Sequence, residues 1–153
     1  MPRVQRAADV TWEGNVARGS GTISAQTGAF ADLGYSLATR IGAAEGKTSP
    51  EELLAAAHAA CYAMSLANEL ASAGTPVEWL AVTATVTLDE VEGGSHRIVF
   101  SELQARARGD GIERDALERA ARAADEGCPL SALISASAEV TVKTELEGER
   151  DGD

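Results

Sequence analysis

Two cysteines are the only thiols in this chain of 153 residues, and each lies in a setting that suits redox chemistry. Cys61 lies within a long, alanine-rich apolar segment of helical character. Cys128 directly precedes Pro129, and because proline is favoured in the first turn of a helix, we expect the cysteine to cap that helix. A helix N-terminus favours negative charge, which gives Cys128 a physical reason to ionise. The two thiols are far apart in the sequence, so only the fold can bring them together.

A cysteine attacks a peroxide only as a thiolate, and the pKa of a free thiol is about 8.5. Burial of Cys61 in an apolar helix disfavours the anion further, so either a cation reaches this thiol or it is inert. Buried free cysteines are commonly inert. The leading candidate for the cation is Arg40, which ends the strand-like stretch 34–40 shortly before the helix. Arg18 is the alternative, but its glycine-rich surroundings indicate a turn.

The start of the same helix supplies a carboxylate. Ser49 as N-cap, Pro50 in the first turn and Glu52 three residues after the cap predict a capping box. Glu51 is then free to hold an arginine in a bidentate pair. Glu51 and Cys61 are about 15 Å apart along a helix axis, so one arginine cannot easily contact both on one helix. Two helices packed antiparallel in a dimer would bring Glu51 of one subunit towards the thiol of the other; alternatively, an arginine or the substrate bridges the distance.

Histidine and metal chemistry are weaker hypotheses. His58 lies three residues before Cys61 and could act as a base, but a packed structural histidine is the favoured interpretation. A metal site would have to combine His58, Cys61, His96 and Cys128, which lack the closely spaced ligand pairs typical of zinc sites. We therefore predict no metal and no other cofactor.

Composition limits the class of protein. A formal net charge of −11 argues against nucleic-acid binding, which needs a basic face. No uncharged apolar stretch reaches the length of a membrane span, and no secretory signal is evident at the N-terminus. We expect a cytoplasmic protein with a single domain over 1–153, a folded core over about 8–146 and a charged, disordered tail over 147–153.

The order of predicted elements indicates an α+β fold with mainly antiparallel sheet, because strands and helices do not alternate regularly. The predicted strands are 10–16, 21–25, 34–40, 82–88, 96–108 and 136–146, and the predicted helices are 50–73, 112–126 and 129–134. Helix 50–73 is apolar nearly all round, so it must be buried on several sides. One small domain offers too little cover for it, which predicts a homodimer in which the partner packs its own copy of this helix.

The run Thr48-Ser-Pro-Glu-Glu-Leu-Leu-Ala-Ala-Ala-His-Ala-Ala-Cys-Tyr-Ala-Met64 closely resembles the signature of the osmotically inducible protein C family, which includes the organic hydroperoxide resistance proteins. Further similarity lies in Trp12-Glu-Gly14, Gly19-Ser-Gly-Thr22, Ala38-Thr-Arg40 and Gly127-Cys-Pro-Leu-Ser131. The resemblance covers roughly residues 8–146 and is closer to the osmotically inducible branch. It implies an intertwined homodimer in which sheets from both subunits wrap two long central helices.

The resemblance also implies a thiol peroxidase that reduces organic hydroperoxides without metal or flavin. By position, Cys61 resembles the peroxidatic cysteine, Cys128 the resolving cysteine, Arg40 the arginine that activates the thiolate and Glu51 the carboxylate that orients it. A dithiol, from a lipoyl-bearing protein, is the implied reductant. Two other hypotheses remain: a redox-sensing or ligand-binding dimer with negligible turnover, and a structural dimer with two inert thiols.

Overall fold

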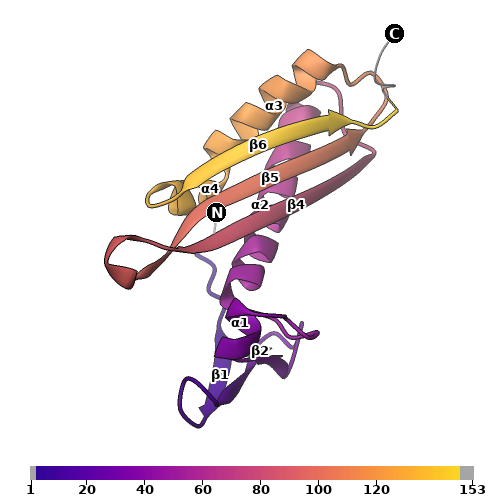
Figure 1. Ribbon diagram of the computed structural model, residues 1–153. Helices are drawn as coiled ribbons and strands as arrows, with labels where there is room; N and C mark the ends of the chain where they lie inside the picture. The colour runs from indigo at the N-terminus through magenta and orange to yellow at the C-terminus, as the bar shows by residue number, and fades with distance from the viewer. Residues whose placement is uncertain (1–2, 149–153) are drawn as a thin grey trace. The chain divides into compact units, whose positions relative to one another are not determined.

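The computed structural model describes residues 3–148, and the chain divides into two compact units, one ending at Leu53 and the other beginning at Leu54. Figure 1 shows the elements of both units. Each unit is considered by itself. The predicted disorder of the tail falls partly on residues 149–153, which lie outside the described residues, and the single-domain organisation remains a prediction.

The first unit is built on a small antiparallel sheet of order β1-β2-β3. Its strands are β1 (Ala8–Glu13), β2 (Ser20–Ala25) and β3 (Leu33–Tyr35). Strand β1 ends before the predicted boundary at Val16, because Gly14 takes a positive φ of 90° and a turn closed by Gly19 N–H on the Asn15 carbonyl follows. Gly21 is needed where it stands, since an added Cβ would lie 2.5 Å from the Tyr35 ring.

The segment after β3 corrects the prediction of a strand over 34–40. Strand β3 stops at Tyr35, and α1 (Leu37–Ile41) follows, capped by Ser36. The Ser36 hydroxyl accepts from the Thr39 N–H at 3.1 Å, and the Thr39 hydroxyl accepts from the Ser36 N–H at 3.2 Å. This reciprocal cap satisfies two N–H groups that a helix leaves free, so a local Ser-x-x-Thr pattern outweighs the strand-like composition.

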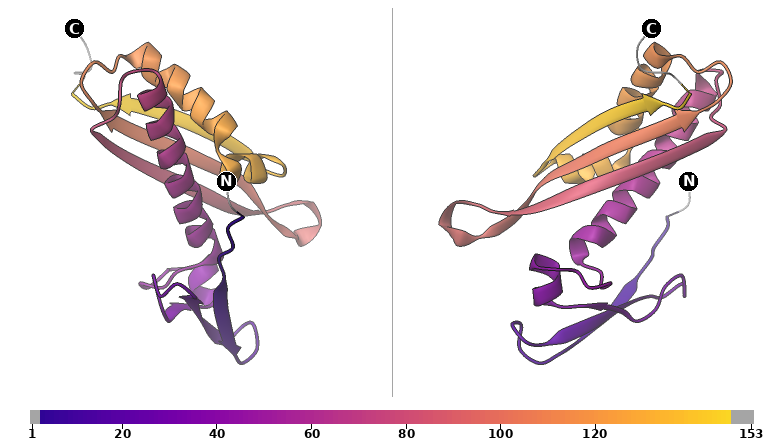
Figure 2. Two further views of the ribbon diagram at one scale, coloured as in Figure 1. Left: turned by 180° about the vertical axis from the view of Figure 1, so that it is seen from behind. Right: turned by 45° about the vertical axis from the view of Figure 1, so that its right-hand side comes forward.

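The second unit is built on a three-stranded sheet of order β4-β5-β6 (Figure 2). The strands are β4 (Trp79–Glu90), β5 (His96–Arg108) and β6 (Glu139–Leu146), and the short 3-10 helix η1 (Glu92–Gly94) joins the first two. Strands β4 and β5 are antiparallel, whereas β6 runs parallel to β5. A parallel pair needs a crossover, which α3 (Arg114–Gly127) and α4 (Pro129–Ser135) provide.

Most sequence-predicted boundaries in this unit agree with the structure to within three residues. Helix α3 includes Gly127 as its last residue, one residue beyond the predicted end of this helix at residue 126. Strand β6 begins at Glu139 rather than Ala136, because the N–H groups of Ser137 and Ala138 both bond back to the Ile134 carbonyl and extend the end of α4. The α+β class with mainly antiparallel pairing is confirmed.

The core of the second unit lies between one face of the sheet and the helices (Figures 1 and 2). Alternate residues of β5 are buried on this face, while the residues between them are exposed, as expected for a sheet covered on one side. The buried members of β5 are Ser101, Leu103, Ala105 and Ala107. Residues of α3, chiefly small alanines, pack against them.

Helix α2 (Pro50–Ser72) closely matches its predicted range. A glycine cap ends it, because Gly74 has a φ of 84° and the Thr75 N–H bonds to the Leu70 carbonyl at 3.0 Å. Its buried stripe, His58, Tyr62, Leu66 and Leu70, has no exposed surface. The opposite face, with Ala57, Ala60 and Met64, is exposed, and Met64 is 76% exposed. Among the described residues of the second unit, only one side of this apolar helix is covered.

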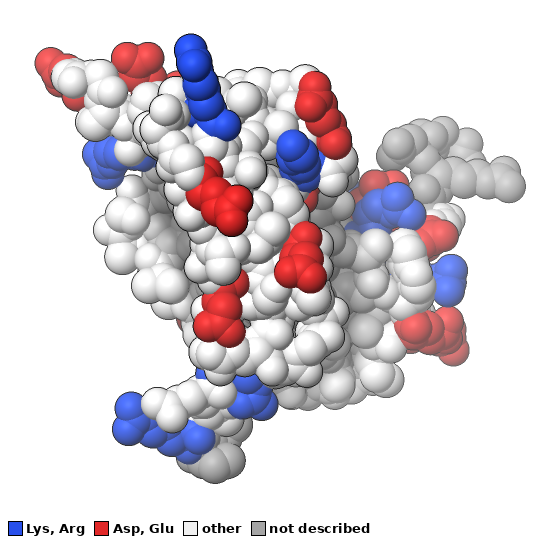
Figure 3. Space-filling view, turned by 90° about the horizontal axis from the view of Figure 1, so that it is seen from below, with Lys and Arg blue, Asp and Glu red and all other residues white. Residues whose placement is uncertain are grey.

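The surface carries an excess of acidic groups. On the face shown in Figure 3, acidic side chains are spread over uncharged surface and basic side chains interrupt them. Among residues 3–148, no helix combines the length and apolarity that crossing a bilayer requires.

Candidate active site

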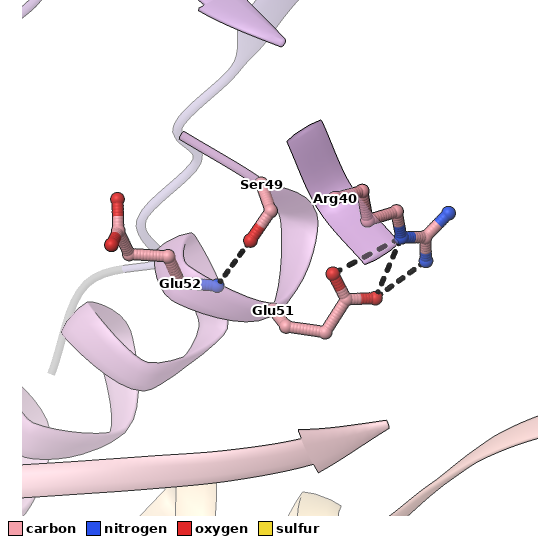
Figure 4. A network of polar contacts seen from close by, with 4 residues as sticks. All are labelled: Arg40, Ser49, Glu51 and Glu52. Carbon is pink, nitrogen blue, oxygen red and sulfur yellow. Dashed lines mark hydrogen bonds and ion pairs between the residues drawn. The ribbon is translucent and has the colours of Figure 1, made fainter. Parts of the chain in front are cut away.

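An arginine–glutamate pair in the first unit joins α1 to the start of α2. The Arg40 Nε lies 3.0 and 3.1 Å from the two carboxylate oxygens of Glu51, and its Nη2 also donates to one of them (Figure 4). The pairing of these two residues, which the sequence offered as a possibility, is therefore present. Glu51 is 9% exposed, whereas a third of the Arg40 side chain remains open to solvent.

The ion pair holds both groups in their charged forms. The hydrogen bond to Glu51 raises the pKa of Arg40 against the opposing effect of burial. Burial alone would raise the pKa of Glu51, but hydrogen bonds from Arg40 and the backbone, together with the arginine's charge, lower it overall. The result is a fixed guanidinium with part of its surface free to meet another anion.

The start of α2 fixes Glu51. The Glu52 N–H donates to the Ser49 hydroxyl at 3.1 Å, which confirms Ser49 as the cap (Figure 4). In place of the predicted return bond from Glu52 to the cap backbone, the Glu52 carboxylate accepts from the Thr48 hydroxyl at 2.9 Å. Glu52 is thus occupied at the helix start, and Glu51 is the carboxylate that meets the arginine.

The second unit brings the two cysteines together. Both thiols are free; Cys61 on α2 is half-buried and packs against the core cluster that contains the fully buried Cys128. Burial raises the pKa of the Cys61 thiol, the backbone of Leu130 lowers it by hydrogen bonding, and the neighbouring Cys128 raises it. The net effect is upward, so the surroundings of Cys61 in its own unit do not by themselves activate it.

Cys128 lies at the junction of α3 and α4. It ends α3 and is the N-cap of α4, with Pro129 in the first turn, as the sequence predicts. Its sulfur accepts from the Ser131 N–H at 3.5 Å. The first turn of α4 therefore directs backbone N–H groups at both sulfurs: Ser131 at Cys128 and Leu130 at Cys61.

His58 is a packed histidine, as favoured from the sequence, and it makes two short polar contacts. Its Nδ1 lies 2.6 Å from the Ser101 hydroxyl of β5, and its Nε2 lies 2.7 Å from the Ser131 hydroxyl of α4. Burial lowers the pKa of His58, and the charge of Asp125 only partly opposes this, so the ring is neutral near pH 7. Neither serine was identified from the sequence; the only available signal for Ser101 is a polar residue at a core-facing position of a strand.

The four predicted site residues thus form two pairs, one in each unit. Arg40 meets Glu51 in the first, and Cys61 meets Cys128 in the second. The alternative cation, Arg18, lies in an exposed turn where its N–H bonds to the Asn15 side chain, as its surroundings predicted. Within residues 3–148, no cluster of three or more His, Cys, Asp or Glu side chains is placed to hold a metal ion.

Comparison with known proteins identifies the family. A family model described as OsmC-like protein matches residues 42–143. Peroxiredoxin OsmC of Escherichia coli (strain K12) is 34% identical over 144 residues, covering 94% of this chain and 98% of that protein, and Peroxiredoxin OsmC of Shigella flexneri matches equally.

Solved structures agree with this assignment at the level of the fold. An OsmC-like protein of unknown function from Vibrio cholerae gives a TM-score of 0.74 at 18% identity, with 94% of this chain and 100% of that chain covered. The organic hydroperoxide resistance protein OhrB of Bacillus subtilis gives 0.69 at 24% identity, with 91% and 98% covered. The resemblance in the sequence motifs is confirmed, and this chain belongs to the OsmC family.

Proposed function

We propose that this protein is a cysteine-based peroxidase that reduces organic hydroperoxides to alcohols. The observation that carries the proposal is the pair of free thiols in contact at the first turn of α4, in a chain whose curated relatives are named peroxiredoxins. The name of the structurally similar Bacillus subtilis protein supports organic hydroperoxides as the substrate class.

In the proposed first step the Cys61 thiolate attacks the terminal oxygen of the hydroperoxide. A sulfur–oxygen bond forms, the oxygen–oxygen bond breaks, and the leaving alkoxide takes a proton to become the alcohol. Cys61 is left as a sulfenic acid. We assign this step to Cys61 because it is the more accessible thiol, whereas Cys128 has no exposed surface.

In the second step Cys128 condenses with the sulfenic acid. The sulfur–sulfur bond forms as hydroxide leaves, and with the thiol proton it becomes water. This reaction protects Cys61 from irreversible over-oxidation. An external dithiol then reopens the disulfide by two exchange steps, and we propose a lipoyl-bearing protein as its source.

Arg40 is proposed to supply a positive charge to the Cys61 thiol, whose pKa no cation among the described residues of its own unit lowers. A guanidinium stabilises both the thiolate and the charge that develops on the leaving alkoxide. Its bonds with Glu51 fix its direction and leave part of the group free.

A steady-state assay tests the proposed function. With dihydrolipoamide as reductant, we expect catalytic turnover of cumene hydroperoxide and slower turnover of hydrogen peroxide. Oxidation of the cysteines without repeated turnover would favour a redox sensor instead. Thiols that resist both peroxide and thiol reagents in the native protein would indicate a structural dimer with inert cysteines.

We also propose that the protein is an obligate homodimer in which the exposed apolar face of α2 meets its copy. This face includes Ala57, Ala60 and Met64, and its burial would remove apolar surface from water. Sedimentation velocity at micromolar concentration is expected to give the mass of a dimer, and Met64→Lys should shift the population towards monomer because a charge would enter the interface. A wild-type protein that sediments as a folded monomer would contradict the proposal.

A further inference from the structure

Ser131 contacts both the proposed resolving cysteine and the buried histidine. Its backbone N–H donates to the Cys128 sulfur at 3.5 Å, and its hydroxyl lies 2.7 Å from Nε2 of His58. Its side chain is 3% exposed. Any movement of this residue therefore changes the surroundings of the Cys128 sulfur.

His58 is itself held in place from the sheet. Its Nδ1 lies 2.6 Å from the hydroxyl of Ser101 on β5, and both residues have no exposed surface. A neutral imidazole has one N–H, so one serine hydroxyl must donate to the ring and the other must accept from it. Buried polar groups are costly to leave unpaired, so each contact fixes the orientation of the ring.

The bridge from Ser101 through His58 to Ser131 connects the elements that carry the two thiols. Cys61 is on α2, one helical turn after His58, and Cys128 caps α4, whose first turn contains Ser131. The same turn contributes the Leu130 backbone that hydrogen-bonds to Cys61. The bridge therefore ties the Cys128-bearing turn directly to the helix that carries Cys61.

We propose that His58 is a positioning residue for disulfide formation: through Ser131 it holds the first turn of α4 so that Cys128 meets the oxidised sulfur of Cys61. The inference rests on the proposed function for its reaction, in which Cys61 sulfenic acid and the Cys128 thiol give a disulfide and water. His58 touches neither sulfur in this role and transfers no proton to either.

The two serines offer a matched pair of variants. Ser131→Ala and Ser101→Ala each remove one buried hydroxyl and leave one nitrogen of the same ring without its partner. Only the first variant disconnects the turn that carries Cys128. A purely structural histidine would make the two variants behave alike, whereas a positioning role makes them differ.

The first measurement is the equilibrium between the Cys61–Cys128 disulfide and a glutathione buffer, which yields the effective concentration of one thiol towards the other without any peroxide. We expect this quantity to fall at least about tenfold in Ser131→Ala, since small misplacements of reacting groups are costly, and to stay close to wild type in Ser101→Ala. Equal changes in the two variants, or no change in Ser131→Ala, would overturn the inference.

The second measurement is a single turnover with one equivalent of cumene hydroperoxide, followed by mass spectrometry. Ser131→Ala should still form the sulfenic acid on Cys61 but convert it to the disulfide more slowly than wild type, so that the sulfenic acid accumulates and a further addition of excess peroxide over-oxidises Cys61. Wild-type protein that resists peroxide but forms the disulfide in glutathione would refute the proposed peroxidase function alone. Disulfide formation at the wild-type rate in Ser131→Ala would refute the positioning role alone.

Two variants of the histidine keep the test independent of the folding of Ser131→Ala. In His58→Gln, the side-chain amide can occupy the place of Nε2 and keep the contact with Ser131. In His58→Asn, the shorter side chain can place its amide only where Nδ1 lies, so it keeps only the contact with Ser101. His58→Gln should therefore retain a higher effective concentration than His58→Asn. The reverse order would contradict the proposal.

Discussion

Replacement of Cys61 by serine is expected to abolish peroxide consumption altogether, because a serine hydroxyl is not a thiolate and Cys128 is fully buried. No sulfenic acid should be trapped in this variant. Cys128→Ser is the matched control, since it removes the other thiol by the same substitution. It should still consume about one equivalent of hydroperoxide, accumulate the sulfenic acid on Cys61 and over-oxidise with excess peroxide.

Mass spectrometry of both variants after one equivalent of organic hydroperoxide separates the two roles. Oxidation that appears first on Cys128 would reverse the assignment. That outcome has a physical basis, because Cys128 is the cap of α4 and accepts a backbone N–H bond from Ser131. The greater accessibility of Cys61 is the reason to expect it as the attacking thiol.

Arg40→Ala is expected to slow peroxide reduction by at least about tenfold while leaving the fold intact, because a cation would be lost from both the thiolate and the developing alkoxide. The pH dependence should move as well. The reaction accelerates as pH rises through the pKa of Cys61, and loss of the cation raises that pKa. The midpoint of the pH–rate profile should therefore move to higher pH, with the largest deficit below the wild-type midpoint.

Arg18→Ala is the control for this prediction. Arg18 carries the same charge in an exposed turn of the same unit and makes a backbone bond that the substitution keeps. Its kinetics should match wild type. Normal rates in Arg40→Ala together with slow rates in Arg18→Ala would transfer the activating role to Arg18.

Local signals in the sequence were sufficient for most elements. Helix α2 has its cap at Ser49 and its end at Gly74, and both depend on residues within a few positions of the helix. Where local signals conflicted, the prediction was wrong: Arg40 was assigned to a strand, because its apolar neighbours outweighed the cap made by Ser36 and Thr39.

Polar contacts between residues far apart in the chain could not be predicted from the sequence. Ser101 and Ser131 are 43 and 73 positions from His58, and nothing in their own surroundings marks them as its partners. Serine is common on surfaces and at helix starts, so its presence alone does not predict a buried contact. The direction of β6 was open for a similar reason, since pairing with β5 depends on the crossover through α3 and α4.

The sequence by itself determined which residues are available for the chemistry. These are the two thiols, of which Cys128 caps the start of a helix, and the carboxylate of Glu51, which the cap of α2 does not use. These follow from residue type and from contacts between near neighbours. Only the tertiary structure decided which groups meet: Arg40 with Glu51, Cys61 with Cys128, and His58 with two serines. Such pairings depend on how strands and helices pack across long stretches of chain, and the same local sequence is compatible with many of them.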